Sequence, residues 1–445
     1  MRAHTYLKLI TALMAFGLAS ALYLRGVEAH SAYFVSTILL VAALIASFCK
    51  DSIATNMVLV AWSVVVGMYT LEGALPMLKS LSKGSDNTLR GQYAAERNIT
   101  YDFRTQSEFM RDMRNEGKMI YPAFPNGGVF KRDKGGEKQV IRGLDGEILF
   151  PLGSISGVTT VFGNETGQYL VYDSDEHGFH NASGIWDVAS LDIAAVGDSY
   201  THGASVSSKQ NFVALIREQL PKTLNLGHGG SGPIAELGTI LEYLPTRQPK
   251  LVLWFFWPGN DLNEDIHREK ASSRLMAYLN EPPILQNLLL QQKFIDDAMR
   301  EYIDSRMRLP DDRKSEPHIA KKMLDFLSLK FLRTRLWYIL KGPELDYETF
   351  RAILQKAQLR VASWNGELAL VYLMQSRPDE EQREKVLDIC ADLGISIIDV
   401  QDVISSAGVM ASEYFYPYKA HYTVEGNRAV SKLILREIDR QTLLN

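Results

Sequence analysis

The chain has 445 residues, which is too long for one ordinary domain and predicts about two or three folding units. Apolar residues make up 46% of it and charged residues 22%, as in a globular protein, and the formal net charge is −4. Because no run of Lys or Arg forms a basic stripe, we expect no nucleic-acid partner. The only two cysteines, Cys49 and Cys390, predict neither a disulfide framework nor a thiolate metal site.

The N-terminus contains three apolar stretches, at residues 9–24, 30–49 and 52–71. The second and third carry no charged residue over the roughly 20 residues that a bilayer-spanning helix needs. The first is shorter, and the Lys8 side chain can extend from it to the membrane interface. We therefore predict a membrane anchor of three transmembrane helices within residues 1–75. The alternatives are a signal peptide with its cleavage site at "ASA", 19–21, and a buried helical hairpin in a soluble protein.

Two regions of different texture follow the anchor. Residues 76–117 are polar and are interpreted as a connector with a helical part. Residues 118–190 are rich in Gly, Pro and aromatic residues and contain short runs of β-forming residues, which predicts a small β-rich accessory region.

From Leu191 to the C-terminus, apolar runs alternate with helical patterns. The predicted strands are 191–196, 223–226, 251–257, 367–374 and 395–400, and the predicted helices are 211–220, 234–244, 379–394 and 425–441. Near-continuous apolar runs indicate strands that are covered on both faces. The alternation predicts an α/β domain over 191–445, with a doubly wound, flavodoxin-like parallel sheet of about five strands.

A long charged segment at 262–350 interrupts this alternation and is predicted to be a helical insertion. A crossover of this size exceeds what the sheet topology needs. Two interpretations stay open: a cap or lid beside the site, or a helical hairpin that only packs on the sheet or on the membrane surface.

Short polar turns that contain Gly follow the first three predicted strands. They read "GDSYTHG" at 197–203, "NLGHGGSGP" at 225–233 and "PGNDL" at 258–262, and "AHYTVEGNRAV" at 420–430 precedes the last helix. Because the carboxyl ends of parallel strands meet at one edge of a sheet, we expect these turns to lie close together.

In these four blocks the sequence resembles the SGNH/GDSL hydrolase superfamily, over about 191–262 and 365–441. The markers are Ser199 in "GDS", Gly230 in "NLGHGG", Asn260 in "GND" and His421 in "HYTVEG". Upstream, "YDSDEHGFHN" at 172–181 looks like the lead-in of membrane-anchored bacterial members.

The resemblance implies a serine nucleophile, Ser199, with His421 as its general base. The oxyanion hole would consist of the backbone N–H groups of Ser199 and Gly230 and the side-chain amide of Asn260. Asp198 and Asp261 would support the turns.

The alternative for Ser199 is a helix N-cap, and for His421 a surface or capping histidine. His202 and His228, which lie close to the site in the sequence, are interpreted as loop residues without a chemical role. No residue spacing predicts a metal site, and we expect no cofactor.

One departure from the family pattern concerns the acid that orients the histidine. The family places an Asp two or three residues before its His, where this chain has Lys419 and Tyr418. Three explanations are open: a Ser-His dyad whose ring is oriented by a backbone carbonyl, an acid from elsewhere in the chain, or a weakened or inactive site. The candidate acids are Asp399, Asp402, Asp173 and Asp175.

The sequence thus predicts a membrane-anchored serine esterase or O-acyltransferase, with an acylated small molecule or carbohydrate as substrate. The resemblance suggests O-acetyl groups on cell-surface or exported polysaccharide, and a catalytic domain outside the cytoplasmic membrane of a bacterium. The alternative is an inactive carbohydrate-binding or assembly protein with the same fold. A transporter component is disfavoured, because the spans carry few polar residues beyond Asn56 and Glu72.

The lipid bilayer is the second partner that the anchor implies. Basic residues flank both ends of the anchor, so the positive-inside rule does not settle its orientation. The sequence predicts no oligomeric state.

Overall fold

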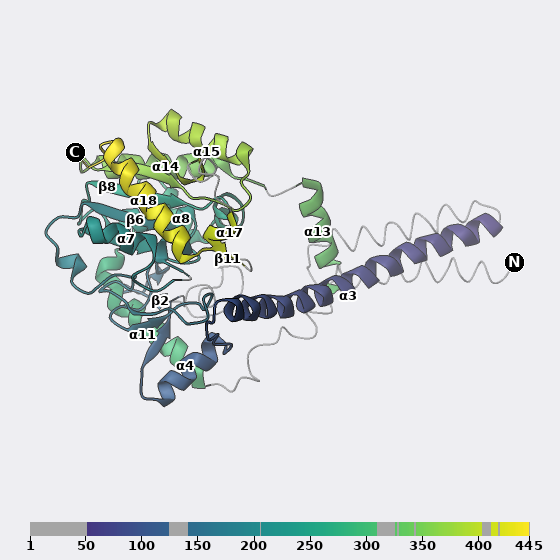
Figure 1. Cartoon of the computed structure of the whole chain (residues 1–445). Coiled ribbons are helices and arrows are strands. Elements are labelled where there is room, and N and C mark those ends of the chain that lie inside the picture. The colour runs from purple at the N-terminus through teal and green to yellow at the C-terminus, as the bar shows by residue number, and fades with distance from the viewer. Residues whose placement is uncertain are drawn as a thin grey trace. The chain divides into compact units, whose positions relative to one another are not determined.

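The computed structural model (Figure 1) describes residues 51–123, 141–204, 206–308, 325–326, 329–341, 344–402, 411–416 and 419–444. The chain divides into two compact units. One comprises residues 1–87 and 310–343, and the other comprises residues 88–309 and 344–445.

The larger unit is built on a parallel five-stranded sheet with the order β10-β9-β8-β6-β7. Its strands are β6 (Ile193–Gly197), β7 (Thr223–Gly227), β8 (Leu251–Phe256), β9 (Glu367–Tyr372) and β10 (Ser396–Asp399). Counted along the chain, the first of these strands lies between the second and the third, which is the flavodoxin-like order. All five strands overlap the predicted runs, so the predicted parallel sheet is confirmed.

Helices cover both faces of this sheet (Figure 1). On one face, α7 (Phe212–Gln219) and α18 (Val424–Arg440) pack on side chains such as Ile193, Leu253 and Val371. On the other, α8 (Pro233–Tyr243), α14 (Tyr347–Ala362) and α15 (Glu380–Leu393) pack on the alternate side chains, such as Val196 and Trp254. Burial on both faces explains the continuous apolar runs in the strands.

The predicted β-rich region packs into the same core as the sheet. It follows α4 (Gln106–Asn115) and contains β1 (Ile120–Pro122), β2 (Ile141–Arg142), β3 (Ile148–Leu149), β4 (Thr159–Val161), β5 (Val171–Asp173) and the 3-10 helix η1 (Ile185–Asp187). β4 pairs parallel with β1 and antiparallel with β5, and β2 pairs with β3. Leu149, Ile155 and Phe179 belong to the hydrophobic cluster of the sheet, so this region is not a separate domain.

The described part of the predicted insertion is helical. It contains η2 (Asp261–Asp265), α9 (Ile266–Glu269), α10 (Ser273–Met276), η3 (Ala277–Leu279) and α11 (Leu288–Arg308). Leu288, Ile295 and Met299 of α11 are buried in the core cluster, and the Asp296 carboxylate accepts a hydrogen bond from the Ser156 backbone N–H at 2.9 Å. α11 therefore packs against the β-rich region, which favours the packing alternative for this part of the insertion.

The smaller unit contains α13 (Lys330–Lys341) and most of α3 (Asp51–Glu96). The buried Glu72 carboxylate accepts hydrogen bonds from the backbone N–H groups of Phe331 and Leu332, at 2.8 and 2.7 Å, and so caps the start of α13. α3 continues through Pro76, although the predicted boundary between anchor and connector falls at this residue.

Two predicted spans, 9–24 and 30–49, lie outside the described residues, whereas 52–71 lies within α3. In the described part of the chain, no helix combines the length and apolarity needed to cross a membrane.

Candidate active site

Ser199 occupies the sharp turn between a buried strand and a short helix. β6 ends at Gly197, and α6 (Ser199–His202) begins at Ser199 itself. The Asp198 carboxylate caps this helix by accepting a hydrogen bond from the Tyr200 backbone N–H at 2.9 Å. Asp198, rather than Ser199, is therefore the N-cap. This leaves the Ser199 hydroxyl available for another partner.

That partner is His421. Its Nε2 lies 2.8 Å from the Ser199 Oγ, although 222 positions separate the two residues in the chain. His421 belongs to β12 (Lys419–Tyr422), which pairs with β11 (Phe415–Tyr416) after α17 (Ala411–Tyr414). Thr423 then caps α18, so the histidine is held between a strand pair and a helix start. The predicted Ser-His contact is present.

The other ring nitrogen of His421 contacts an acid that the sequence did not reveal. The Glu165 carboxylate lies 2.9 Å from Nδ1, and the two side chains are only 17% and 20% exposed. An ionised carboxylate can only accept, so Nδ1 carries the hydrogen and Nε2 is left to accept from the Ser199 hydroxyl. The three side chains thus form a Ser-His-acid relay.

Glu165 lies in the loop between β4 and β5, and a preceding segment of the chain fixes this loop. The Asn164 side chain donates to the Asp102 carbonyl at 2.7 Å and accepts from the Gly167 N–H at 2.9 Å. The Tyr101 hydroxyl donates to the Asn164 carbonyl at 3.1 Å. These bonds hold the residues on both sides of the acid.

An acid from elsewhere in the chain was one of the open explanations, but the four residues proposed for it were wrong. Asp399 pairs with Arg383, and Asp402 follows it in the same segment. Asp173 accepts from the Thr159 hydroxyl. Asp175 is buried at the centre of its own turn, where it accepts from the backbone N–H groups of His177 and Phe179.

The two further oxyanion candidates follow the strands on either side of β6. Gly230 comes after β7, with a φ of 76° that favours glycine, and Asn260 comes after β8, immediately before η2. The His228 N–H donates to the Gly197 carbonyl at 3.0 Å, which fixes the start of the Gly230 turn against the end of β6. The topology thus brings Ser199, Gly230 and Asn260 to one edge of the sheet, as predicted.

The segment after Asn260 also holds the Gly230 turn. The Arg268 guanidinium donates to the Gly230 carbonyl at 2.7 Å and contacts Asp265. The Glu269 carboxylate accepts from the N–H groups of Gly232, Ile234 and Ala235 and caps α8. We call Arg268, Asp265 and Glu269 the turn clamp.

The two predicted supporting residues, Asp198 and Asp261, are buried. Asp261 accepts from the Trp257 backbone N–H at 2.8 Å and closes the turn after β8. Burial raises the pKa of Asp198 to about 6. Burial, together with the negative charge of the nearby Glu236, raises the pKa of Asp261 well above its usual range. Asp198 thus caps α6 and Asp261 closes the turn after β8, and the Asp198 carboxylate also lies 3.5 Å from the Ser199 Oγ.

His202 and His228 lie behind the site in a buried cluster. His202 Nε2 lies 2.6 Å from the Tyr172 hydroxyl, its Nδ1 accepts from the Gly229 N–H at 3.3 Å, and His228 Nε2 lies 3.2 Å from the Ser154 Oγ. Burial lowers the pKa of His228 to about 4 and that of His202 well below its usual value, so both rings are neutral near pH 7. His228 lies in the loop after β7, as predicted, whereas His202 lies in α6, and both side chains are buried.

No protein-family model matches the chain, and no curated protein matches it. Solved structures that resemble it include a lipase/acylhydrolase from Enterococcus faecalis, with 15% identity and a TM-score of 0.34 over 56% of this chain and 96% of that one. Another, from Desulfitobacterium hafniense, is described as a lipolytic protein of the G-D-S-L family, with 13% identity and a TM-score of 0.31 over 55% and 97% of the two chains. A third is an acetylxylan esterase from Geobacillus stearothermophilus, with 12% identity and a TM-score of 0.32 over 55% and 93%.

One of these proteins, the lipolytic protein from Desulfitobacterium hafniense, is described as a member of the G-D-S-L family, which the four sequence blocks also resemble. At TM-scores near 0.3, however, the likenesses are too distant to support a function for this chain. The functional assignment therefore depends on the site itself.

Proposed function

We propose that the chain is a serine esterase or O-acyltransferase of the SGNH/GDSL type. The observation that carries this proposal is the continuous hydrogen-bonded series from the Ser199 hydroxyl through His421 to the Glu165 carboxylate. A serine that only caps a helix does not need a histidine and an acid hydrogen-bonded in line with its hydroxyl. Here Asp198, not Ser199, is the N-cap of α6.

In the proposed reaction, the Ser199 Oγ attacks the ester carbonyl while His421 Nε2 takes the hydroxyl proton. Glu165 stabilises the imidazolium that forms and keeps its ring in place. The backbone N–H groups of Ser199 and Gly230 and the Asn260 amide stabilise the oxyanion. The imidazolium then protonates the leaving alcohol, and an acyl-enzyme forms on Ser199.

The acyl-enzyme is released by a second nucleophile. If water attacks, the result is hydrolysis, and if a sugar hydroxyl attacks, it is acyl transfer. We propose an acylated carbohydrate as substrate, with O-acetyl groups on a cell-surface or exported polysaccharide as the specific case. The sequence resemblance supports this choice.

The test of the chemistry uses the full chain and a short-chain aryl ester. The wild type is expected to hydrolyse the ester and to react covalently with a fluorophosphonate probe, whereas Ser199→Ala does neither. Equal turnover by the two proteins would refute the assignment. The alternative of an inactive binding protein rests on the absence of an Asp just before His421. Glu165 supplies a carboxylate to the His421 ring in its place, so this reason no longer applies.

We further propose that residues 1–75 anchor the enzyme in the bacterial cytoplasmic membrane with the catalytic unit outside. Uncharged apolar stretches support this, as do the large apolar side chains that α3 exposes, among them Ile53, Leu59, Val60 and Val66. Fractionation of cells that express the full chain tests the anchor, and protease accessibility in spheroplasts tests the side. Recovery of the untreated chain in the soluble fraction would contradict the proposal.

A further inference from the structure

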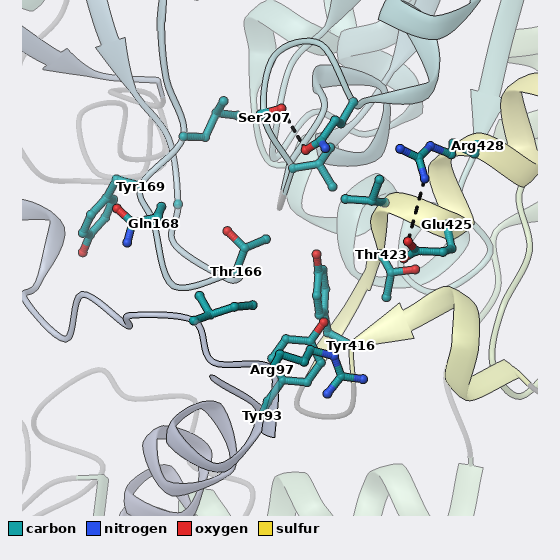
Figure 2. Close-up of a pocket in the computed structure, with 16 residues that line it drawn as sticks. Tyr93, Arg97, Thr166, Gln168, Tyr169, Ser207, Tyr416, Thr423, Glu425 and Arg428 are labelled. Atoms are coloured by element: carbon teal, nitrogen blue, oxygen red, sulfur yellow. Dashed lines mark hydrogen bonds and ion pairs between the residues drawn. The ribbon is translucent and has the colours of Figure 1, made fainter. Parts of the chain in front are cut away.

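A cavity of about 560 Å³ adjoins the loop that carries Glu165 (Figure 2). Gly163 and Thr166, which lie on either side of Glu165 in the chain, line it, and so does Thr423, two residues after His421. The segments that hold the acid and the base therefore also form walls of the cavity. Ser199 and His421 do not line it, so an occupant would be a part of the substrate that does not react.

Fixed aromatic rings form part of the lining. Tyr169 stacks on Phe109 with ring centroids 4.4 Å apart, and its hydroxyl donates to the Arg104 carbonyl at 2.6 Å. Tyr93 and Tyr416 meet edge to face at 5.5 Å. These contacts hold the rings in place before any ligand arrives, which lowers the entropy cost of binding.

The remaining lining is polar and comes from several elements. Figure 2 shows Gln168 on one side of the cavity and Glu425 and Arg428 on the other. Arg97 lies over the Tyr93 ring at 3.9 Å, and Arg428 pairs with Glu425 at 3.9 Å. A fatty acyl chain would cover these charged and polar groups with apolar surface and shield them from water, which disfavours a lipid occupant.

Sugars match this combination of groups. The C–H faces of a pyranose ring pack on aromatic rings, and its hydroxyls hydrogen-bond to amide, hydroxyl and guanidinium groups at the ring edge. The volume also falls within the range of about 300–1,000 Å³ that is typical of small-ligand sites.

We propose that this cavity is a glycan subsite, which binds a sugar residue next to the acylated one along the same chain. The inference rests on the proposed function. It adds the place in the structure where the acceptor or substrate polymer binds. A sugar bound there would contact the two segments that carry Glu165 and His421, because Gly163, Thr166 and Thr423 line the cavity. The binding energy of a non-reacting sugar can thereby position the ester at Ser199.

The test measures binding rather than turnover. The full-length Ser199→Ala protein in detergent is applied to an array of neutral and acidic polysaccharides, and dissociation constants are measured for those it retains. Arg97→Ala and Arg428→Ala are each made in the Ser199→Ala background. They are compared with Arg436→Ala in that background, which removes an arginine outside the cavity from α18, the helix of Arg428, with an exposure similar to that of Arg428. Thermal midpoints verify that each variant is folded.

We expect at least one polysaccharide to bind, each cavity variant to bind it about tenfold more weakly, and Arg436→Ala to match the parent. Retention of no polysaccharide, or equal affinities for all variants, would overturn the subsite. Turnover of the aryl ester by the wild type tests the proposed function independently. An active esterase that binds no glycan would therefore refute the subsite alone.

Discussion

The Glu165 carboxylate contacts Nδ1 of His421 across 256 positions of the chain. The acid thus comes from the loop of the β4–β5 hairpin, upstream of the nucleophile, and not from the segment that precedes the histidine. The β-rich region therefore contributes a residue to the candidate active site.

Replacing Glu165 with Gln is expected to lower kcat for an aryl ester by about 10²–10⁴-fold, because the amide neither stabilises the imidazolium nor fixes its tautomer. Glu165→Asp should retain more activity than Glu165→Gln. Steady-state kinetics measures both. Asp173→Asn, in the same hairpin, is the matched control and should behave as the wild type, since Asp173 contacts Thr159 instead. A Glu165→Gln enzyme with full activity would show that Ser199 and His421 work as a dyad.

The turn clamp predicts a role for Arg268 in positioning Gly230. Arg268→Ala is expected to reduce kcat about tenfold with little change in KM, because the Gly230 N–H serves the transition state more than the bound ester. Arg268→Lys should recover part of the loss. Arg436→Ala controls for the removal of a surface charge. A change confined to KM would assign Arg268 to substrate binding instead.

Acid is expected to destabilise the protein through its buried histidines. Burial lowers the pKa of His180 to about 4, and its ring contacts the His202 carbonyl and the Ser208 hydroxyl at 2.8 and 3.0 Å. Below pH 6.5 the unfolded chain takes up a proton on this residue, whereas the folded one does not until the pH nears 4. The contribution of His180 to stability is therefore full above pH 6.5, and about 2 kcal/mol of it is lost by pH 5.

Urea unfolding between pH 7.5 and 5 checks this expectation. His180→Gln should show a shallower fall in the free energy of unfolding than the wild type, whatever its stability at pH 7. Parallel slopes for wild type and His180→Gln would contradict the assignment.

Glu72 is expected to hold the first turn of α13. Because its carboxylate accepts from two N–H groups that have no partner within the helix, Glu72→Ala should destabilise the helix start by about 0.5–2 kcal/mol. Amide hydrogen exchange over residues 331–341 should then accelerate, while Glu301→Gln on the surface of α11 should not change it. Unaltered exchange in Glu72→Ala would exclude a capping role.

The strands of the sheet could be predicted because burial on both faces leaves an apolar run at each of them. Ser199 and His421 could be found because each stands in a block of fixed local spacing. Glu165 could not, because its place depends on strands of three residues, β4 and β5, which are too short to show a period. The local sequence "FGNETG" around Glu165 contains no motif that predicts a contact with His421.

The continuation of α3 through Pro76 was missed for a related reason. Proline disfavours a helix interior and the chain becomes polar after this residue, so the local sequence predicts a boundary at a position where the helix continues.

The origin of the acid also has a kinetic consequence. The relay joins residues 165, 199 and 421, so it forms only after His421 has met two residues that lie 222 and 256 positions before it in the chain. Contacts this distant form late, because their loop-closure entropy must be overcome before they stabilise the chain. The helices and the sheet core can thus form before the relay does, and we expect the proposed esterase activity to arise only once the β4–β5 hairpin has docked.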